Sequence, residues 1–488
     1  MAKPMIRVNN GTPSRWVSEA VLYPFDNRSI PFIAGLRLHL VAGKSPGKKN
    51  PIVVAAGEAG APDDESVRFY GTVIPVDGEL RMWYMGRSTL DDPEEVGGQL
   101  RVCYATSTDG IRWEKPHLGL VEFNGNRNNN IVDLRGGRCE FAAIPVLYEP
   151  DDPDPNRRFK IVFESGIYGN RFAVAYSPDG FTWTESPNNP VGPVLEQTGL
   201  IRFNGCYYVN GQGGSHFGSG RKMATFASYD FEHWTQAGCL SFRRDNIPPR
   251  TMVEGWNAGE QVHLGAGLWD RGSVILGVYD MWHGDPSDDR SRIGMDIGLI
   301  ISHDALHFYE PIPDFRFIPA YEELETVPGK NPTVSHGQGM FNIGAKTMLW
   351  YEAWANPPVQ VRLATWERDR LGYYEAFASQ DPHLISCPIE LDCPGRAFAN
   401  VSGLGENAEL HIELLDERFV PLPGFSGDDS AVLNEPGPKN ESEAQGLRVP
   451  VVWKGGESIP GPGTFRVKSS FSGIRLEDVK LFALYVSE

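Results

Sequence analysis

The stretch YATSTDGIRW, residues 104–113, decides the fold, because weaker copies of it return along the 488-residue chain. Further copies end at Trp183, Trp234 and Phe308, and LATWERDRLGYY, around Asp369, is the weakest. Each copy joins a short apolar strand to an aromatic-ended strand through a polar turn, where Asp and Gly tolerate left-handed backbone. A unit that recurs five times, 51 to 74 residues apart, is typical of a radial or stacked architecture. We therefore interpret the copies as the outer hairpins of five propeller blades.

The aspartate of each clear copy is expected to shape its turn rather than to take part in chemistry. Asp side chains in turns accept hydrogen bonds from nearby backbone amides. The outer hairpins of a propeller also lie away from its axis. We therefore exclude four aspartates from the candidate site: Asp109, Asp179, Asp230 and Asp304.

The composition favours many short strands joined by turns. The chain contains 54 glycines and 38 prolines, 11% of its residues are aromatic, and long helix-period stretches are scarce. A chain of this length exceeds one ordinary domain and buries a large core. The formal net charge of −18 makes nucleic acid and anionic membrane surfaces unfavourable partners.

The N-terminal sequence MAKPMIRVNNGTPSRW lacks the apolar core of a secretory signal, so we expect a cytoplasmic protein. No run approaches the roughly 18 apolar residues of a membrane span. Six cysteines without CxxC spacing are expected as buried thiols rather than as a disulfide framework or a zinc site. The pattern requires no cofactor; a calcium ion on the propeller axis is an alternative that no ligand spacing supports. The sequence does not set the oligomeric state.

The chain divides into a predicted five-bladed β-propeller catalytic domain (1–377), a linker (378–394) and a β-sandwich (395–488). Within the propeller, residues 1–65 are expected as an entry segment, and each blade as four strands. GYYEAF, residues 372–377, is expected to end the fifth blade. The alternating strands of the sandwich carry no constellation of chemical groups, so we expect that domain to be structural.

The predicted site follows from how strands run in a blade. The first strand of a blade follows the axis and the second runs back, so the start of one and the end of the other share a face. Starts of first strands carry Glu65, Arg68, Glu140, Glu196, Glu260, His263, His336 and Gln338. Ends of second strands carry Arg87, Glu164, Gln212, Asp280, His283, Glu352 and Trp354.

Carboxylates that converge on one pocket, with Trp and His nearby, suit cleavage of a glycosidic bond. One protonated acid donates to the leaving oxygen, and another carboxylate attacks the sugar or activates water. Crowding of like charges raises one pKa and leaves the other low. The residues nominated as catalytic are Glu196, Glu140 and Glu65. The residues nominated for binding a carbohydrate substrate are Arg68, Arg87, Glu164, Trp256, Glu260, His263, Asp280, His283, His336, Gln338 and Glu352.

Each nomination has a structural alternative. Glu196 would otherwise be a solvated turn residue, and Glu140 would pair with Arg138. Glu65 lies two residues after Asp63, which favours an exposed acidic turn. Three more would be bonded polar groups of the core or rim: Glu260, His263 and His336.

The string YGTVIPVDGELRMWYMG, followed by YATSTDGIRWEKP, resembles the first blade of the five-bladed glycoside hydrolases, the group that includes families 32, 43 and 68. LGLVEFNGNRNNNIV, YEPDDPDPNRRFKIVF and the C-terminal VVWKGG and VKLFALY are similar to uncharacterised bacterial proteins labelled family-32-like. This resemblance spans nearly the whole chain. In the characterised families, acids from the innermost strands of three blades serve as nucleophile or base, as transition-state stabiliser and as general acid.

The resemblance implies roles for individual acids. LEQTGLIRFNG resembles the Glu-Cys-Pro-Asp-Leu-Phe signature of family 32, which implies that Glu196 is the general acid. RCEFAAIPV stands in place of the Arg-Asp-Pro signature, with Glu140 as the nearest carboxylate. VRFYGTV stands in place of Asn-Asp-Pro-Asn-Gly, with Glu65 just upstream and Asp26 as another candidate. The implied class is a glycoside hydrolase with a rebuilt site, or a relative with different sugar chemistry.

Three hypotheses follow. The first is an enzyme that cleaves a glycosidic bond, exo-acting on a furanoside or a small oligosaccharide, with Glu196 as acid and Glu140 or Glu65 opposite. The second is a carbohydrate-binding propeller without catalysis. The third is a lyase or transglycosylase that uses the same pocket with His336 or His263 as base.

Overall fold

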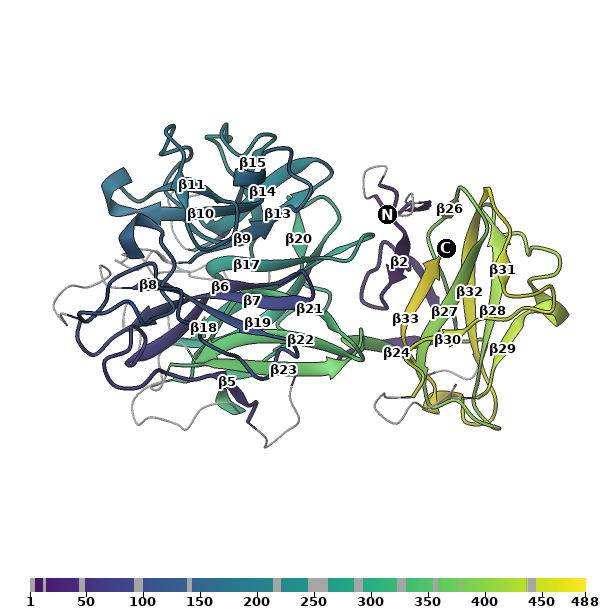
Figure 1. The fold of residues 1–488 in the computed structure, drawn as a ribbon. Helices are drawn as coiled ribbons and strands as arrows, with labels where there is room; N and C mark the ends of the chain where they lie inside the picture. The colour runs from purple at the N-terminus through teal and green to yellow at the C-terminus, as the bar shows by residue number, and fades with distance from the viewer. Residues whose placement is uncertain are drawn as a thin grey trace.

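The computed structural model describes residues 5–11, 15–43, 49–91, 100–137, 143–213, 221–244, 262–284, 293–322, 331–353, 359–377, 380–435, 437 and 445–488. Over these residues the chain is all-β, with a body of several sheets on the left of Figure 1 and a two-sheet domain on the right. Both chain ends lie at the two-sheet domain (Figure 1). No helix in the described part is long and apolar enough to cross a membrane.

The described part of the larger body contains five units: three are separate four-stranded sheets, and the first and the last unit are joined in one seven-stranded sheet. Unit one contains β6 (Ser66–Val76), β7 (Glu79–Arg87) and β8 (Arg101–Ser107). Unit two contains β9 (Val146–Tyr148), β10 (Phe159–Ser165), β11 (Arg171–Ser177) and β12 (Thr184–Glu185). Unit three contains β13 (Glu196–Phe203), β14 (Cys206–Gln212), β15 (Met223–Ser228) and β16 (Cys239–Phe242). Unit four contains β17 (Val262–Asp270), β18 (Ile275–Gly284), β19 (Ile293–Ser302) and β20 (Phe308–Tyr309), and unit five β21 (Val334–Ile343), β22 (Lys346–Ala353), β23 (Val361–Glu367) and β5 (Ile52–Val54).

The five units close into a ring. Their first strands contact one another in the order β6, β9, β13, β17, β21 and back to β6, where β21 and β6 pair in parallel. Strand β5, from the beginning of the chain, pairs with β23 and completes unit five. Because the first unit and the last are joined, the ring leaves no inner strand as a free edge among the described residues.

The repeated turns have the predicted structure. The carboxylate of Asp109 accepts hydrogen bonds from the backbone N–H groups of Ile111 and Arg112, both at 2.8 Å, and Ser107 Oγ accepts from Gly110 N–H at 2.9 Å. The same Ser-x-Asp geometry recurs at Ser177/Asp179, Ser228/Asp230 and Ser302/Asp304. The prediction that these four aspartates are turn formers is confirmed.

The fifth copy departs from this pattern. In the first two copies the residue after the aspartate is a glycine in the left-handed region, with φ of 76° at Gly110 and 84° at Gly180. In the fifth copy Asp369 itself takes this conformation, with φ of 59°. Its carboxylate is turned away from the hairpin and accepts from the hydroxyls of Tyr23 and Tyr485, at 2.6 and 2.9 Å.

The two-sheet domain is built from both ends of the chain. Its first sheet contains β1 (Ile6–Val8), β3 (Phe32–Ala34), β25 (His383–Ile385), β26 (Ile389–Leu391), β28 (Glu409–Asp416), β29 (Ala431–Leu433) and β32 (Gly463–Ser472). Its second contains β2 (Glu19–Leu22), β4 (Leu36–Leu40), β24 (Gly372–Ala376), β27 (Gly395–Ser402), β30 (Val449–Pro450), β31 (Ser458–Ile459) and β33 (Lys480–Ser487). Leu410 and Ile412 of the first sheet and Ala399 and Leu484 of the second share one buried core. Short 3-10 helices cover Arg135–Gly137, Pro155–Arg157, Gly166–Tyr168, Ala320–Glu322, Gly427–Asp429 and Leu476–Asp478.

This topology corrects three sequence predictions. Four strands of the predicted entry segment, 1–65, belong to the two-sheet domain, and only β5 joins the ring. The predicted linker, 378–394, contains β25 and β26, which both pair with β32. Strand β24, predicted to end the fifth blade, pairs instead with β4 and β33. Each of these three errors concerns a short strand that pairs with a strand far away in the sequence. No local sequence pattern indicates such a pairing.

A buried polar network joins the two bodies. Asp369 accepts, besides the two tyrosine hydroxyls, from Arg271 Nη2 of unit four at 3.0 Å. Nearby, Asp26 accepts from Ser29 and from His303 Nε2 at 3.0 Å, and both Asp26 and His303 are fully buried. These contacts place Asp26, an alternative acid from the sequence, at the junction between the bodies rather than at the predicted site.

Three of the six cysteines, Cys103, Cys206 and Cys387, are buried free thiols, as expected. Cys239 and Cys393 are partly exposed free thiols, and Cys139 lies outside the described residues.

Candidate active site

The strand register brings the nominated residues to one end of the ring. Glu196 at the start of β13 pairs with Gln212 at the end of β14. His263 at the start of β17 pairs with Asp280 of β18, and Glu352 at the end of β22 pairs with the start of β21. Glu164 occupies the matching end of β10. Carboxyl groups from units two to five therefore lie at the same end of their sheets.

Glu164 and Glu196 form a pair of interacting carboxyl groups. Burial, and then the negative charge of Glu196, raise the pKa of Glu164 to about 8. A carboxyl group with this pKa holds its proton at neutral pH. The pair can therefore supply one acid that donates a proton and one group that accepts hydrogen bonds, which is the division of labour that general acid catalysis needs.

Glu196 is held by a side-chain network. Gln212 Nε2 donates to Glu196 Oε2 at 2.8 Å. The amide oxygen of Gln212 accepts from Arg221 Nη1 at 2.6 Å, and a guanidinium can only donate. This contact fixes which way the amide faces, so its N–H group is directed at Glu196.

His263 continues this network and is fully engaged. Its Nδ1 lies 2.8 Å from Arg221 Nη1, so Nδ1 accepts and the ring proton resides on Nε2. That Nε2 lies 3.4 Å from the hydroxyl of Tyr70. Trp282 packs against the His263 ring at 5.2 Å and lies beneath the Arg221 guanidinium at 5.3 Å. Because both ring nitrogens are taken, His263 is suited to positioning rather than to proton abstraction.

A second carboxyl group, Glu352, is completely buried beside β6. One of its oxygens accepts the backbone N–H of Phe69, and Oε1 has no hydrogen-bond partner among the described residues. Burial raises the pKa of Glu352 to about 8, and the positive charge of Arg68 opposes this shift. Glu352 is therefore largely a neutral carboxylic acid at pH 7.

Asp280 and His336 form a buried pair next to Glu352. Asp280 accepts from the backbone N–H of His336 at 2.9 Å, from its Nδ1 at 2.6 Å and from the Ser335 hydroxyl. His336 Nε2 has no partner in the described part of the chain. Of the two histidines whose side chains are described at this end, His263 and His336, only His336 has an open second nitrogen.

Other nominated residues have different surroundings. Glu65 is 44% exposed and forms an ion pair with Arg87 at 2.9 Å, whereas Asp63 of the same acidic segment is buried. Gln338 accepts from the backbone N–H of Leu200 at 2.6 Å and so ties unit five to unit three. Four nominated or named residues lie outside the described residues: Glu140, Trp256, Glu260 and Trp354. His283 belongs to β18, and its side chain lies outside the described part.

Sequence reasoning missed several groups of this network. Tyr70 and Trp282 are aromatic residues of apolar strands, so the sequence explains them equally well as parts of the hydrophobic core. Arg221 precedes β15, where the sequence pattern gives no reason to single it out. Gln212 is recognisable by its place at the end of β14, but its bond to Glu196 depends on Arg221.

No group of three or more potential metal ligands occurs among the described residues.

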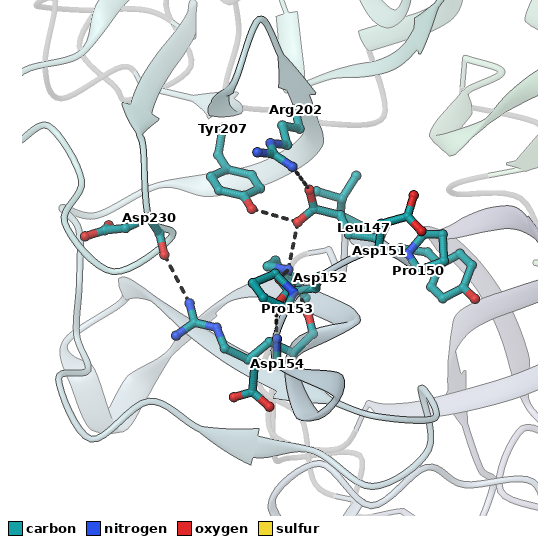
Figure 2. A pocket seen from close by; sticks show the side chains of 13 residues that line it. Leu147, Pro150, Asp151, Asp152, Pro153, Asp154, Arg202, Tyr207 and Asp230 are labelled. Carbon is teal, nitrogen blue, oxygen red and sulfur yellow. Dashed lines mark hydrogen bonds and ion pairs between the residues drawn. The ribbon is translucent and has the colours of Figure 1, made fainter. Parts of the chain in front are cut away.

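A cavity of about 910 Å³ lies at the opposite end of units two and three (Figure 2). One of its lining residues is Lys160, which is 1% exposed and pairs with Glu149 at 2.7 Å and with Asp152 at 2.5 Å. Glu149 also accepts from Arg202 and from the Tyr207 hydroxyl, each at 2.7 Å. Although burial alone would raise it, the bonds from Lys160 and Tyr207 hold the pKa of Glu149 below its usual value. This cavity is therefore lined by a closed ion-pair network that joins two units.

Replacing Lys160 with Met is expected to destabilise the protein by about 3–5 kcal/mol, because Glu149 and Asp152 lose their buried cation. Chemical denaturation at pH 7 measures the effect. Lys346→Met is the matched control, since the Lys346–Glu367 pair is much more exposed than Lys160 and should contribute less than about 1 kcal/mol. Equal losses in the two variants would show that the buried network does not stabilise the ring.

No family model and no curated protein matches this chain. Solved structures do match. One concerns glycoside hydrolase family 130 of mannoside phosphorylases and hydrolases that target β-1,2-mannosidic linkages in Candida mannan (14% identity, 68% of this chain and 97% of that one, TM-score 0.42). Another is a fructofuranosidase from Schwanniomyces occidentalis complexed with fructosylnystose (13% identity, 92% and 99% coverage, TM-score 0.38). A third is an exo-β-1,3-galactanase from Phanerochaete chrysosporium with β-1,3-galactotriose (10% identity, 90% and 100% coverage, TM-score 0.39). At these TM-scores and identities the likenesses carry no argument about this chain, whose activity and substrate are argued from the contacts above.

Proposed function

We propose that the five sheet units form a five-bladed β-propeller and that the two-sheet domain is a β-sandwich. Two observations support this architecture: the closed cycle of contacts between first strands, and the strand β5 that completes unit five. A radial arrangement explains why acids from units two to five gather at one end of the ring. The propeller in this proposal spans β5 to β23, and the sandwich takes the remaining strands.

On this scaffold we propose a glycoside hydrolase that works with Glu164 and Glu196. The observation that carries the proposal is the paired arrangement, in which burial and the charge of Glu196 keep Glu164 protonated at neutral pH. Glu164 donates its proton to the leaving glycosidic oxygen. Glu196, oriented by Gln212, attacks the sugar or activates a water molecule.

This assignment revises the roles expected from the sequence. Glu196 was expected as the acid, with Glu140 or Glu65 opposite. The raised pKa favours Glu164 as the proton donor, and the ion pair with Arg87 gives Glu65 a different partner. Glu140 stays a predicted contributor. In glycoside hydrolases, a separation of roughly 5 Å between the two carboxyl groups corresponds to retention of the configuration at the anomeric carbon, and roughly 6.5–9.5 Å corresponds to its inversion.

Within the proposal the substrate is a furanoside or a small oligosaccharide that is cleaved from one end. A panel of such glycosides, assayed for release of reducing sugar, tests the proposal. We expect turnover that Glu196→Gln abolishes while sugar binding, measured by calorimetry, remains. Binding without turnover on every substrate would instead support a carbohydrate-binding propeller without catalysis.

A second candidate function is favoured by one specific observation, the open and buried Nε2 of His336 beside Asp280. An Asp–His pair of this kind can abstract a proton, as a lyase requires. An unsaturated sugar product, together with activity that His336→Gln abolishes and Glu196→Gln spares, would support this function over hydrolysis.

A further inference from the structure

Arg68 has no bonded partner among the described residues at the end of the ring that carries Glu164 and Glu196. It lies near the start of β6, half-buried, opposite Met85 of β7. The described residues provide its guanidinium with no hydrogen bond and no ion pair. Arg68 acts on the carboxyl group of Glu352 and on the hydroxyl of Tyr70 through its charge alone.

The neighbouring arginines are already bonded. Arg87 pairs with Glu65, and Arg221 binds Gln212 and His263. Arg244, farther along the chain, pairs with Asp314 and donates to the backbone carbonyl of Trp282. Arg68 therefore differs from them, because none of its five N–H donors is bonded within the described part of the chain.

Among the described residues, the acids at this end of the ring make no ion pair with Arg68. Glu352 is fully buried and holds its proton at pH 7, and Asp280 accepts three hydrogen bonds from Ser335 and His336. Glu164, the proposed acid, is also protonated at this pH. A half-buried guanidinium that has no bonded acceptor among the described residues is unfavourable unless a ligand supplies one.

We propose that Arg68 binds the carboxylate of an acidic sugar, so that the substrate class is a glycoside containing a uronic acid. This inference rests on the proposed function, because it places the acidic sugar beside Glu164 and Glu196. A guanidinium binds a carboxylate through two parallel hydrogen bonds, which matches the planar donors of Arg68.

The charge count favours a carboxylate over inorganic phosphate. A sugar carboxylate carries a single negative charge, which one free arginine balances. A phosphate group carries about −1.5 to −2 at pH 7 and would leave excess negative charge next to Asp280 and Glu196. The bonded state of Arg87 and Arg221 means that neither offers a second free cation.

The test compares 4-nitrophenyl uronosides with neutral glycosides that differ only in the carboxylate. We expect wild type to favour the uronoside in kcat/KM, and Arg68→Met to lower that preference about 10- to 100-fold. Arg68→Lys keeps the positive charge but lacks the planar pair of N–H donors, so it should retain part of the preference for the uronoside. Arg112→Met, an exposed outer-hairpin residue, is the matched control and should change nothing.

Equal use of both sugars, or an equal loss on both in Arg68→Met, would overturn the inference and leave glycoside hydrolysis intact. Turnover that requires added inorganic phosphate and releases a sugar phosphate would overturn it as well, in favour of phosphate at Arg68. If no glycoside is turned over, the proposed function fails. The inference is then tested by calorimetry with free uronic acids and their parent neutral sugars. Binding of the uronic acid but not of the neutral sugar, together with loss of that binding in Arg68→Met, would support the inference. Equal binding of the two sugars, or binding of neither, would refute it.

Discussion

Glu164→Gln is expected to lower kcat/KM by about 10²- to 10⁴-fold on a glycoside whose leaving group is a sugar, because the proton donor is removed. The amide of Gln has a similar shape but cannot donate a carboxylic proton. With a 2,4-dinitrophenyl glycoside, whose leaving group needs no protonation, the loss should shrink to less than about tenfold. Steady-state kinetics on the two substrates separates loss of the acid from loss of the fold.

Glu196→Gln is the matched control for this prediction. Its carboxylate is proposed to attack the sugar or activate water, so the loss should be large with both leaving groups. The reverse pattern, in which Glu196→Gln is rescued by the activated leaving group and Glu164→Gln is not, would exchange the two roles. That result would restore Glu196 as the acid, as the sequence resemblance implied.

The raised pKa of Glu164 also predicts how activity and stability depend on pH. Activity should fall as the pH rises through about 8, because the acid then loses its proton. Between about pH 4.5 and 8 the folded state holds a proton that the unfolded chain releases, so this group makes stability decrease as pH rises. Glu164→Gln should therefore stabilise the protein more at pH 9 than at pH 4, by roughly 2–5 kcal/mol. Equal effects at both pH values would contradict the shift.

Much of the ring was predictable because its signals are local. The Ser-x-Asp turn is encoded within a few residues, so Ser107 and Asp109 indicate their hairpin without knowledge of any partner. Strand direction then brings Glu164 and Glu196 to the same end, since a hairpin reverses the chain.

The parts that sequence reasoning missed depend on distant contacts. Strand β5 is three residues long, and nothing in Ile52–Val54 indicates that it completes unit five. The orientation of Gln212 depends on Arg221, a residue that belongs to no recognisable pattern. That Arg68 has no bonded partner in the described part of the chain follows from the three-dimensional contacts of all its neighbours, which no local sequence pattern indicates.

The role of Asp369, in the weakest copy of the repeat, also depends on contacts with residues far away in the sequence. Replacing it is therefore expected to have a large effect on stability. Asp369 is fully buried and accepts hydrogen bonds from Tyr23, Arg271, Asn342 and Tyr485. These partners come from the N-terminal segment, from units four and five, and from the C-terminal strand β33. Asp369→Asn keeps the shape and tolerates the left-handed backbone, but it leaves Arg271 buried without its counter-charge. We expect a loss of about 3–5 kcal/mol in the free energy of unfolding.

Asp109→Asn makes the same chemical change at the first copy of the repeat. There the carboxylate accepts two backbone N–H groups, which the amide oxygen of Asn can also accept, so the loss should stay below about 1 kcal/mol. Urea unfolding followed by tryptophan fluorescence reports on both bodies, because Trp83 and Trp350 lie in the ring and Trp453 in the two-sheet domain. Since Asp369 joins the bodies, its variant should also split a single transition into two. Equal losses at both positions, with one transition retained, would mean that the fifth aspartate is an ordinary turn residue and that the junction is held by apolar packing alone.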